Sequence, residues 1–297
     1  MATSTPRPTI DPVALMRVKS LELRARMVME GFWKGLHRSP FHGFSVEFSE
    51  YRPYTKGDDP RFIDWKVMAR NDRAFIKKFE DETNLRAHLL VDRSKSMAYG
   101  SGEYSKADYA ATFAATLGYF LLGQNDAVGL TTFDEAINDH LPSRNRPGQL
   151  RRMLLKLEQA NEGTGTDLGA ALKGVHEIVR RRSLVLMLSD LLAPLDELER
   201  QLGYLTASGN EVVLFQFLDP REIDFDFSKA THFRDEETGK DLFVDPTLAR
   251  DGYLEKFNAH QSALRSSATR YGARHRLVST DEPLENVLAD FVSGQLH

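Results

Sequence analysis

The chain has 297 residues, of which 41% are hydrophobic, so it is long enough for one large domain or a medium domain with an appendage. A formal net charge of −4 provides no basic field to hold a polyanion, which argues against nucleic acid as a partner. The absence of cysteine excludes disulfides and cysteine-bound zinc, and no apolar stretch is long enough to span a membrane, so we expect a cytoplasmic protein.

The pattern of apolar and polar residues in the first 83 positions predicts an extension that contains one helix and two strands. Apolar residues recur at helical spacing between Asp11 and His37, and Asp11 before Pro12 is typical of a helix start, so we expect one amphipathic helix here. Residues 43–51 alternate apolar and polar with period two, and residues 74–79 are aromatic and β-branched, so both predict strands. The aromatic-rich connector 54–65 serves either for docking or for packing against the rest of the chain.

Residues 84–297 alternate strands with helices, which favours an α/β, doubly wound, Rossmann-like fold with a mostly parallel sheet covered on both faces. Strands are predicted at 87–91, 127–133, 184–188, 212–217 and 275–278. Helices are predicted at 106–122, 147–159, 169–182, 194–208, 247–271 and 283–291. An acidic, glycine-containing turn between two aromatic-bearing runs predicts a hairpin over 231–244. We therefore expect two parts, residues 1–83 and 84–297.

Three polar motifs stand at strand ends or helix starts of the predicted α/β domain. Asp92–Ser96 (Asp-Arg-Ser-Lys-Ser) follows the first strand, Thr166–Asp167 lies in a glycine-rich turn, and Ser189–Asp190 follows a later strand. Because the carboxyl ends of neighbouring strands in a doubly wound sheet converge on one crevice, residues far apart in the sequence are able to share a ligand there. We therefore expect the three motifs to form one site.

Oxygen donors of these types suit a hard divalent cation such as Mg²⁺ or Mn²⁺. Such an ion takes about six oxygen ligands in near-octahedral geometry, and Mg²⁺ usually keeps several waters. The hydroxyls of Ser94, Ser96 and Thr166 are able to ligate directly, while Asp92 and Asp190 hold coordinated waters or orient the hydroxyls. A metal so held keeps residual positive charge, which favours a carboxylate of another molecule as the final ligand. The pattern therefore predicts a cation-dependent recognition site.

The motifs Asp-x-Ser-x-Ser, Gly-Thr-Asp-Leu-Gly and an Asp after an apolar strand resemble the metal-ion-dependent adhesion site (MIDAS) of von Willebrand factor A domains, in the same order, over about residues 87–297. The stretch from Phe32 to Lys66 is similar to the hallmark of the bacterial "domain of unknown function 58" proteins. The first resemblance implies direct metal ligation by Ser94, Ser96 and Thr166, with Asp92 and Asp190 supporting. The second implies a partner or adaptor of a MoxR-type AAA+ ATPase.

Two other functions remain open from the sequence. A metal-dependent phosphoester hydrolase is able to use the crevice of Asp92 and Asp190, although the first loop offers serine where a second carboxylate is wanted. A structural module with a vestigial metal site is the other alternative. The cations Arg93 and Lys95 would weaken metal binding if they pointed inward and would attract an acidic partner if they pointed outward. We expect no catalytic residue and favour the interaction module.

Overall fold

The computed structural model describes residues 9–38, 51–53, 75–77, 85–159, 168–179, 182–227, 231–234 and 241–294. The chain divides into two compact units, one of residues 1–35 and 85–297 and one of residues 36–84. This division differs from the expected one, because the N-terminal helices belong to the same unit as the α/β domain.

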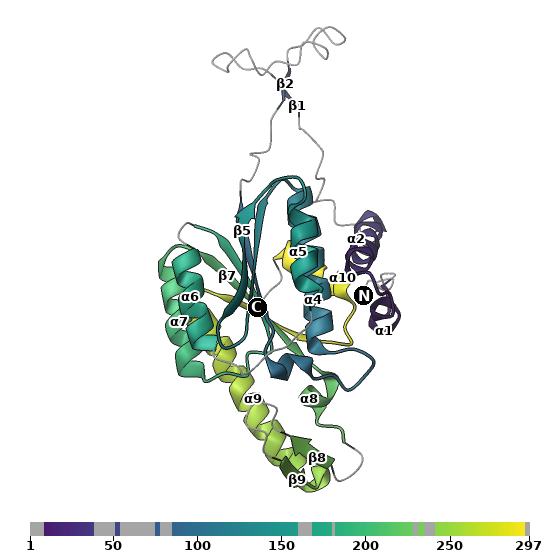
Figure 1. Ribbon diagram of the computed structural model, residues 1–297, viewed down its shortest axis with the longest axis vertical. Coiled ribbons are helices and arrows are strands. Elements are labelled where there is room, and N and C mark those ends of the chain that lie inside the picture. The colour runs from purple at the N-terminus through teal and green to yellow at the C-terminus, as the bar shows by residue number, and fades with distance from the viewer. Residues whose placement is uncertain are drawn as a thin grey trace. The chain divides into compact units, whose positions relative to one another are not determined.

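A six-stranded sheet in the order β10-β7-β6-β3-β4-β5 forms the centre of the larger unit (Figure 1). All neighbouring strands are parallel except β4 and β5. The strands are β3 (Arg86–Asp92), β4 (Ala127–Phe133), β5 (Ile137–Arg144), β6 (Leu184–Ser189), β7 (Glu211–Leu218) and β10 (Arg274–Ser279). β3, β6 and β7 are buried along almost their whole length, as expected for strands covered on both faces. The predicted α/β, doubly wound fold is confirmed.

The edge strand β5 was not predicted from the sequence. Its residues are mostly half-buried and exposed in turn, and it contains Pro142, which sheets tolerate mainly at their edges. The strand pairs antiparallel with β4. Gly129 in β4 permits this pairing, because a Cβ atom at residue 129 would lie 2.7 Å from the backbone nitrogen of Ser143.

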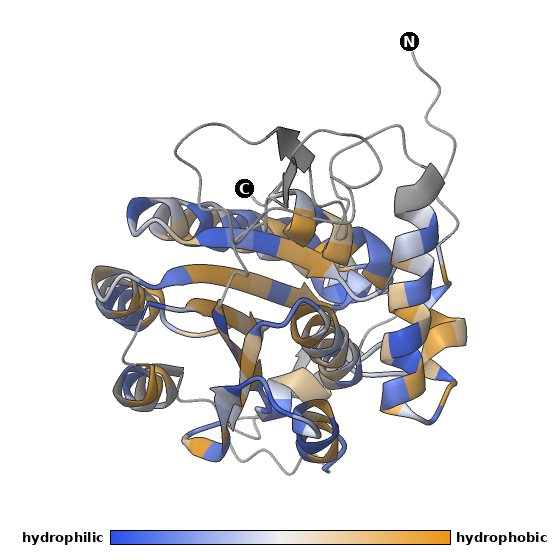
Figure 2. Cartoon of the chain, turned by 90° about the horizontal axis from the view of Figure 1, so that it is seen from above, coloured by the Kyte–Doolittle hydropathy of each residue, from blue (hydrophilic) through white to orange (hydrophobic). Residues whose placement is uncertain are grey.

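Helices cover both faces of the sheet (Figure 1). One face carries α4 (Lys106–Gly123), α5 (Gln149–Leu157) and α10 (Leu284–Ser293), and the other carries α6 (Leu168–Ile178), α7 (Leu195–Ala207) and α9 (Pro246–Arg270). Seen from above, the strands are mainly hydrophobic and the helices carry both hydrophobic and hydrophilic residues (Figure 2). No helix in the described part of the chain is both long and apolar enough to cross a membrane.

Most predicted elements of residues 84–297 are confirmed, with ends that differ by no more than two residues. The predicted hairpin is formed by β8 (Thr231–Arg234) and β9 (Asp241–Val244). Two predictions were wrong or incomplete. α6 ends at Ile178 rather than 182, and the N–H of Ser183, which directly precedes β6, donates to Oδ1 of Asn210 at 3.0 Å. The short helix α8 (Pro220–Asp224) was not predicted.

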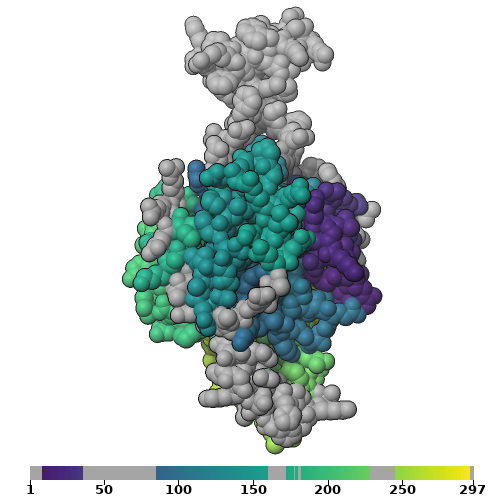
Figure 3. All heavy atoms as spheres, viewed as in Figure 1, coloured from purple at the N-terminus to yellow at the C-terminus, as the bar shows by residue number. Residues whose placement is uncertain are grey.

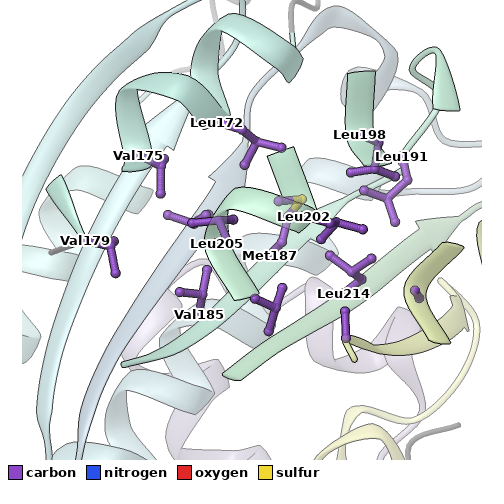
Figure 4. Packing of buried hydrophobic residues seen from close by; sticks show 14 of the residues in the cluster. Leu172, Val175, Val179, Val185, Met187, Leu191, Leu198, Leu202, Leu205 and Leu214 are labelled. Atoms are coloured by element: carbon purple, nitrogen blue, oxygen red, sulfur yellow. The ribbon is translucent and has the colours of Figure 1, made fainter. Parts of the chain in front are cut away.

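The core against α6, α7 and α9 is built from alternate residues of the strands. Val185 and Met187 of β6 pack beneath Leu172 of α6 and Leu202 of α7 (Figure 4). The opposite face is aromatic. Phe113 of α4 lies edge to face with Phe215 of β7, with ring centroids 4.9 Å apart. The sheet is therefore held from both sides, which leaves its strand ends to position polar side chains.

The N-terminal segment forms two helices, α1 (Pro12–Met16) and α2 (Leu21–Arg38), where the sequence predicted one. The carboxylate of Asp11 accepts the N–H of Ala14 at 3.1 Å, so the predicted helix start is confirmed. The break precedes α2, where the hydroxyl of Ser20 accepts the N–H of Leu23 at 3.3 Å and offers the backbone an alternative to a continuous helix.

Helix α2 packs its apolar side on the α/β domain. The ring of Phe32 meets that of Phe120 of α4 edge to face, with centroids 6.1 Å apart. In the space-filling view the N-terminal helices, coloured purple, lie directly against the atoms of that domain (Figure 3). This packing explains why residues 1–35 join the larger unit.

The smaller unit is described at β1 (Tyr51–Pro53) and β2 (Phe75–Lys77), which pair antiparallel with Arg52 opposite Ile76. The predicted strand at 74–79 is therefore confirmed in its centre. The predicted strand at 43–51, apart from its last residue, and the connector 54–65 lie outside the described residues.

Candidate metal site

The predicted site residues Asp92 and Asp190 come together at the carboxyl ends of β3 and β6. The chain passes from β3 to β4 and β5 on one side, and later to β6, β7 and β10 on the other, so the strand order reverses between β3 and β6. Ligands of open α/β sheets bind in the crevice at such a reversal. Asp92 is the last residue of β3, and Asp190 directly follows β6.

The carboxylate of Asp92 is buried and both its oxygens are held by the protein. The backbone N–H of Ser94 donates to Oδ1 at 2.8 Å, and the hydroxyl of Ser189 donates to Oδ2 at 2.5 Å. The hydroxyl of Ser189 also accepts the N–H of Leu191 at 3.0 Å. Ser189 belongs to a motif that the sequence singled out, but its role follows only from the pairing of β3 with β6.

Ser94 and Ser96 place their hydroxyls side by side. Ser94 precedes the 3₁₀ helix η2 (Lys95–Ala98), whose tight turn brings the two Oγ atoms within 3.0 Å. Neighbouring ligands of an octahedral ion with bonds of about 2.1 Å lie about 3.0 Å apart. The pair therefore has the spacing of two adjacent ligand positions of Mg²⁺, and the oxygen donors fit a hard cation.

Asp190 is held by a lysine that the sequence did not single out. Nζ of Lys106, the first residue of α4, lies 2.9 Å from Oδ2 of Asp190 and 2.7 Å from Oε1 of Glu222 in α8. Oδ1 of Asp190 accepts the N–H of Leu192 at 3.3 Å. The buried Leu191 between them has a φ of 54°, a left-handed conformation that is unusual for a leucine.

The electrostatics of the crevice favour the arrival of a cation. Burial, helped by the charge of Asp190, raises the pKa of Asp92 to about 7, against the hydrogen bonds from Ser189 and Ser94. Burial alone would lower the pKa of Lys106, but the carboxylates of Asp190 and Glu222 raise it overall. With all groups ionised, the three carboxylates and the ammonium leave a formal charge of −2, which one divalent cation balances.

The structure describes the two cations that flank the serines, Arg93 and Lys95, but not the third predicted hydroxyl ligand. Thr166, the third predicted hydroxyl ligand, and its neighbour Asp167 lie outside the described residues. Lys95 is exposed, whereas Arg93 donates to the carbonyl oxygens of Leu157 at 2.7 Å and Gln159 at 2.8 Å at the end of α5. A cation there complements the helix dipole.

The candidate site contains both hydroxyl and carboxylate oxygens. Among the residues that the structure describes, no group of three or more histidine and acidic side chains is placed to hold a metal ion. The oxygen donors gathered here include the hydroxyls of Ser94 and Ser96 and the carboxylates of Asp92 and Asp190.

The chain is similar to uncharacterized mycobacterial proteins, to one of them over nearly its whole length. It is 29% identical over 287 residues to the uncharacterized protein Rv1480 of Mycobacterium tuberculosis, which covers 95% of this chain and 89% of that protein. It is 28% identical over 148 residues to the uncharacterized protein MAV169 of Mycobacterium avium, or 49% of this chain and 86% of that one.

Solved structures resemble it more distantly. An aerotolerance-related membrane protein of Bacteroides fragilis, with multiple mutations to serines, matches 71% of this chain and 99% of its own at 14% identity and a TM-score of 0.48. The VWA domain of SpRpn10 matches 69% of this chain and 94% of its own at 12% identity and a TM-score of 0.41. The family model described as "Protein of unknown function DUF58" matches residues 50–263, and the chain belongs to this family.

Proposed function

We propose that this protein is a divalent-cation-dependent interaction module that captures a carboxylate of a partner protein. The pair of hydroxyls of Ser94 and Ser96, 3.0 Å apart, carries this proposal. The pair follows directly after the buried and doubly hydrogen-bonded Asp92. Thr166 would complete the hydroxyl set, as the von Willebrand factor A resemblance implies. A bound Mg²⁺ or Mn²⁺ would supply positive charge and an open ligand position for the carboxylate.

The surroundings of Asp190 support a protein partner. Leu192, whose N–H donates to Asp190, is 52% exposed, and Tyr99 is 36% exposed. The Tyr99 ring centroid lies 5.9 Å from Nζ of Lys106, the group that binds Asp190. Tyrosine is one of the residue types that most often supply the binding energy of protein interfaces, and the exposed Leu192 adds apolar contact area beside it.

The same contacts argue against catalysis. Both oxygens of Asp92 accept hydrogen bonds from this chain, and both oxygens of Asp190 do as well. In addition, Asp92 and Asp190 are each only 1% exposed, whereas a general base or a nucleophile needs an oxygen within reach of the substrate. We therefore propose that the protein is not an enzyme and that neither aspartate acts as a catalytic group.

We further propose a MoxR-type AAA+ ATPase or its client as the partner, and the cytoplasm as the location. The proposal rests on membership of the DUF58 family together with the resemblance described from the sequence. It makes the crevice the point at which an acidic side chain of the ATPase or its client docks.

The test uses the full chain as bait in native lysate, first with Mg²⁺ and then with excess EDTA. Ser96→Ala removes one hydroxyl without disturbing the carboxylates, and Asp92→Ala removes the buried support of the site. Ser266→Ala, which removes an exposed hydroxyl of α9, is the matched control. We expect an ATPase to be retained by wild type and by the control in Mg²⁺, and to be lost in EDTA and in both site variants. If the ATPase were retained equally well in EDTA and by both site variants, the proposal would be contradicted.

A further inference from the structure

A lysine ammonium is buried inside the candidate metal site. The side chain of Lys106 is 0% exposed, and its two partners, Asp190 and Glu222, have side-chain exposures of 2% and 21%. Burying an ammonium is costly unless acceptors surround it, and here two carboxylates do so at 2.9 and 2.7 Å. Lys106 is therefore paired with the same aspartate that is expected to support the metal.

The ammonium is held in place from both sides. Ser105 and Asp108 form a capping box that starts α4, and the backbone N–H of Lys106 donates to the carbonyl of Tyr99 at 2.9 Å. On the other side, Oε2 of Glu222 accepts the N–H of Asp219 at 2.8 Å in the capping box of α8. Two helix starts thus fix the relative positions of the ammonium and its carboxylates, so a cation bound beside Asp190 meets a positive charge that is hard to move.

The fixed charge has two opposing consequences for a divalent cation. It orients Asp190 and compensates its charge before any metal binds, so the crevice keeps its form without metal. It also repels the metal, because a divalent cation that approaches Asp190 meets a like charge already paired with that carboxylate in a buried site. Glu222 shares the ammonium and reduces this repulsion.

We propose that Lys106 is a built-in counter-cation that competes with the divalent metal for Asp190 and keeps the metal affinity of the site low. This inference rests on the proposed function, since it concerns the regulation of the same metal site. Lys106 acts through Asp190 and is a positioning residue. The consequence is a site that is preformed yet weakly occupied, in which the carboxylate of a partner adds the binding energy that retains the metal.

The experiment measures the dissociation constant for Mn²⁺ alone on the full chain, with free Mn²⁺ followed by electron paramagnetic resonance. Lys106→Met removes the competing charge, and we expect Mn²⁺ to bind at least about tenfold more tightly. Glu222→Gln removes one of the two carboxylates that neutralise the Lys106 ammonium, so its full charge acts at Asp190. We expect Mn²⁺ binding to weaken by about threefold or more. Lys156→Met is the matched control, because Lys156 makes a more exposed ion pair with Asp139, and we expect no change there.

The direction in which Lys106→Met changes the Mn²⁺ affinity tests the inference. If Lys106 merely held the site together, both variants would weaken Mn²⁺ binding, so weaker or unchanged binding by Lys106→Met would overturn the inference. If Lys106→Met does not fold, the double variant Lys106→Met/Glu222→Gln, which removes both charges together, must bind more tightly than Glu222→Gln alone. Failure of wild type and every variant to bind Mn²⁺ would overturn the proposed function itself. Binding by wild type that Asp92→Ala abolishes would leave that function standing, whatever Lys106→Met does.

Discussion

At the scale of single residues, the candidate site depends on a carboxylate in an unfavourable environment. Asp92 is 1% exposed and accepts hydrogen bonds from Ser94 and Ser189, but burial and the charge of Asp190 raise its pKa to about 7. An unfolded chain has no such burial, so its Asp92 titrates near 3.8. Asp92 is therefore only partly ionised at neutral pH, and a bound cation would favour its ionised form.

The first prediction concerns the pH dependence of stability. Below pH about 4 Asp92 is protonated in both states, and between about 4 and 7 only the folded state keeps the proton, so this residue's contribution to stability is lost as pH rises. Asp92→Asn has no proton to lose. The free energy of unfolding of Asp92→Asn minus that of wild type should therefore increase by on the order of 2 kcal/mol from pH 5 to pH 8.

Urea unfolding in EDTA at the two pH values measures this difference. Excess Mg²⁺ at pH 8 provides an internal control, since it should stabilise wild type more than Asp92→Asn. A stability difference that stays constant between pH 5 and pH 8 would show that Asp92 does not titrate in this range.

At the scale of elements, the pairing of β4 with the edge strand β5 depends on a single glycine. A Cβ atom at Gly129 would lie 2.7 Å from the backbone nitrogen of Ser143 and 2.9 Å from the carbonyl oxygen of Leu141. Leu141 pairs with Leu130, and Ser143 lies in the irregular stretch of β5 between the pairs Val128–Arg144 and Leu130–Leu141, directly opposite Gly129. This close approach is a packing requirement, because Gly129 is not among the residues with positive φ.

The second prediction is that Gly129→Ala destabilises the protein by about 1–3 kcal/mol, since overpacking forces a backbone shift. Gly102→Ala is the matched control, because a Cβ atom there meets nothing within 4 Å. Thermal unfolding of both variants checks the difference. Equal melting temperatures for the two variants would mean that β5 adjusts without cost.

At the scale of the whole molecule, the N-terminal helices are part of the α/β unit. Phe32 is 4% exposed and packs on Phe120 of α4, the helix whose first residue is Lys106. The backbone N–H of Ile10 donates to the carboxylate of Glu285 in α10 at 3.1 Å. The N-terminal segment thus contacts both α4 and the C-terminal helix α10, which cover the same face of the sheet.

The third prediction is that Phe32→Ala lowers the free energy of unfolding by about 3–5 kcal/mol, the usual cost of truncating a buried phenylalanine. Because α2 and the domain form one unit, circular dichroism and the fluorescence of Trp33 in α2, measured in a Trp65→Phe background, should report one coincident transition. Leu23→Ala, at a position 46% exposed on the same helix, is the control and should change stability little. A separate early transition in Phe32→Ala would instead show that the helices unfold independently of the sheet.

The sequence by itself determined the order of strands and helices, the doubly wound fold and the placement of the polar motifs. Periodicity and apolar runs are local signals, and a motif at a strand end such as Asp92–Ser96 needs only that local pattern to be located. It did not predict β5, whose apolar residues do not alternate regularly and which contains Pro142. It also did not predict the break between Met16 and Leu21, where the hydroxyl of Ser20 accepts the N–H of Leu23.

Only the tertiary structure decided what surrounds the predicted aspartates. Ser189 meets Asp92 across 97 positions of sequence, and Lys106 meets Asp190 across 84. These contacts follow from strand order and from where two helices begin, which no local pattern records. The charge balance of the site, and with it the proposed metal affinity, therefore belongs to the folded chain, because electrostatic interactions depend on distances in space and on burial rather than on sequence separation.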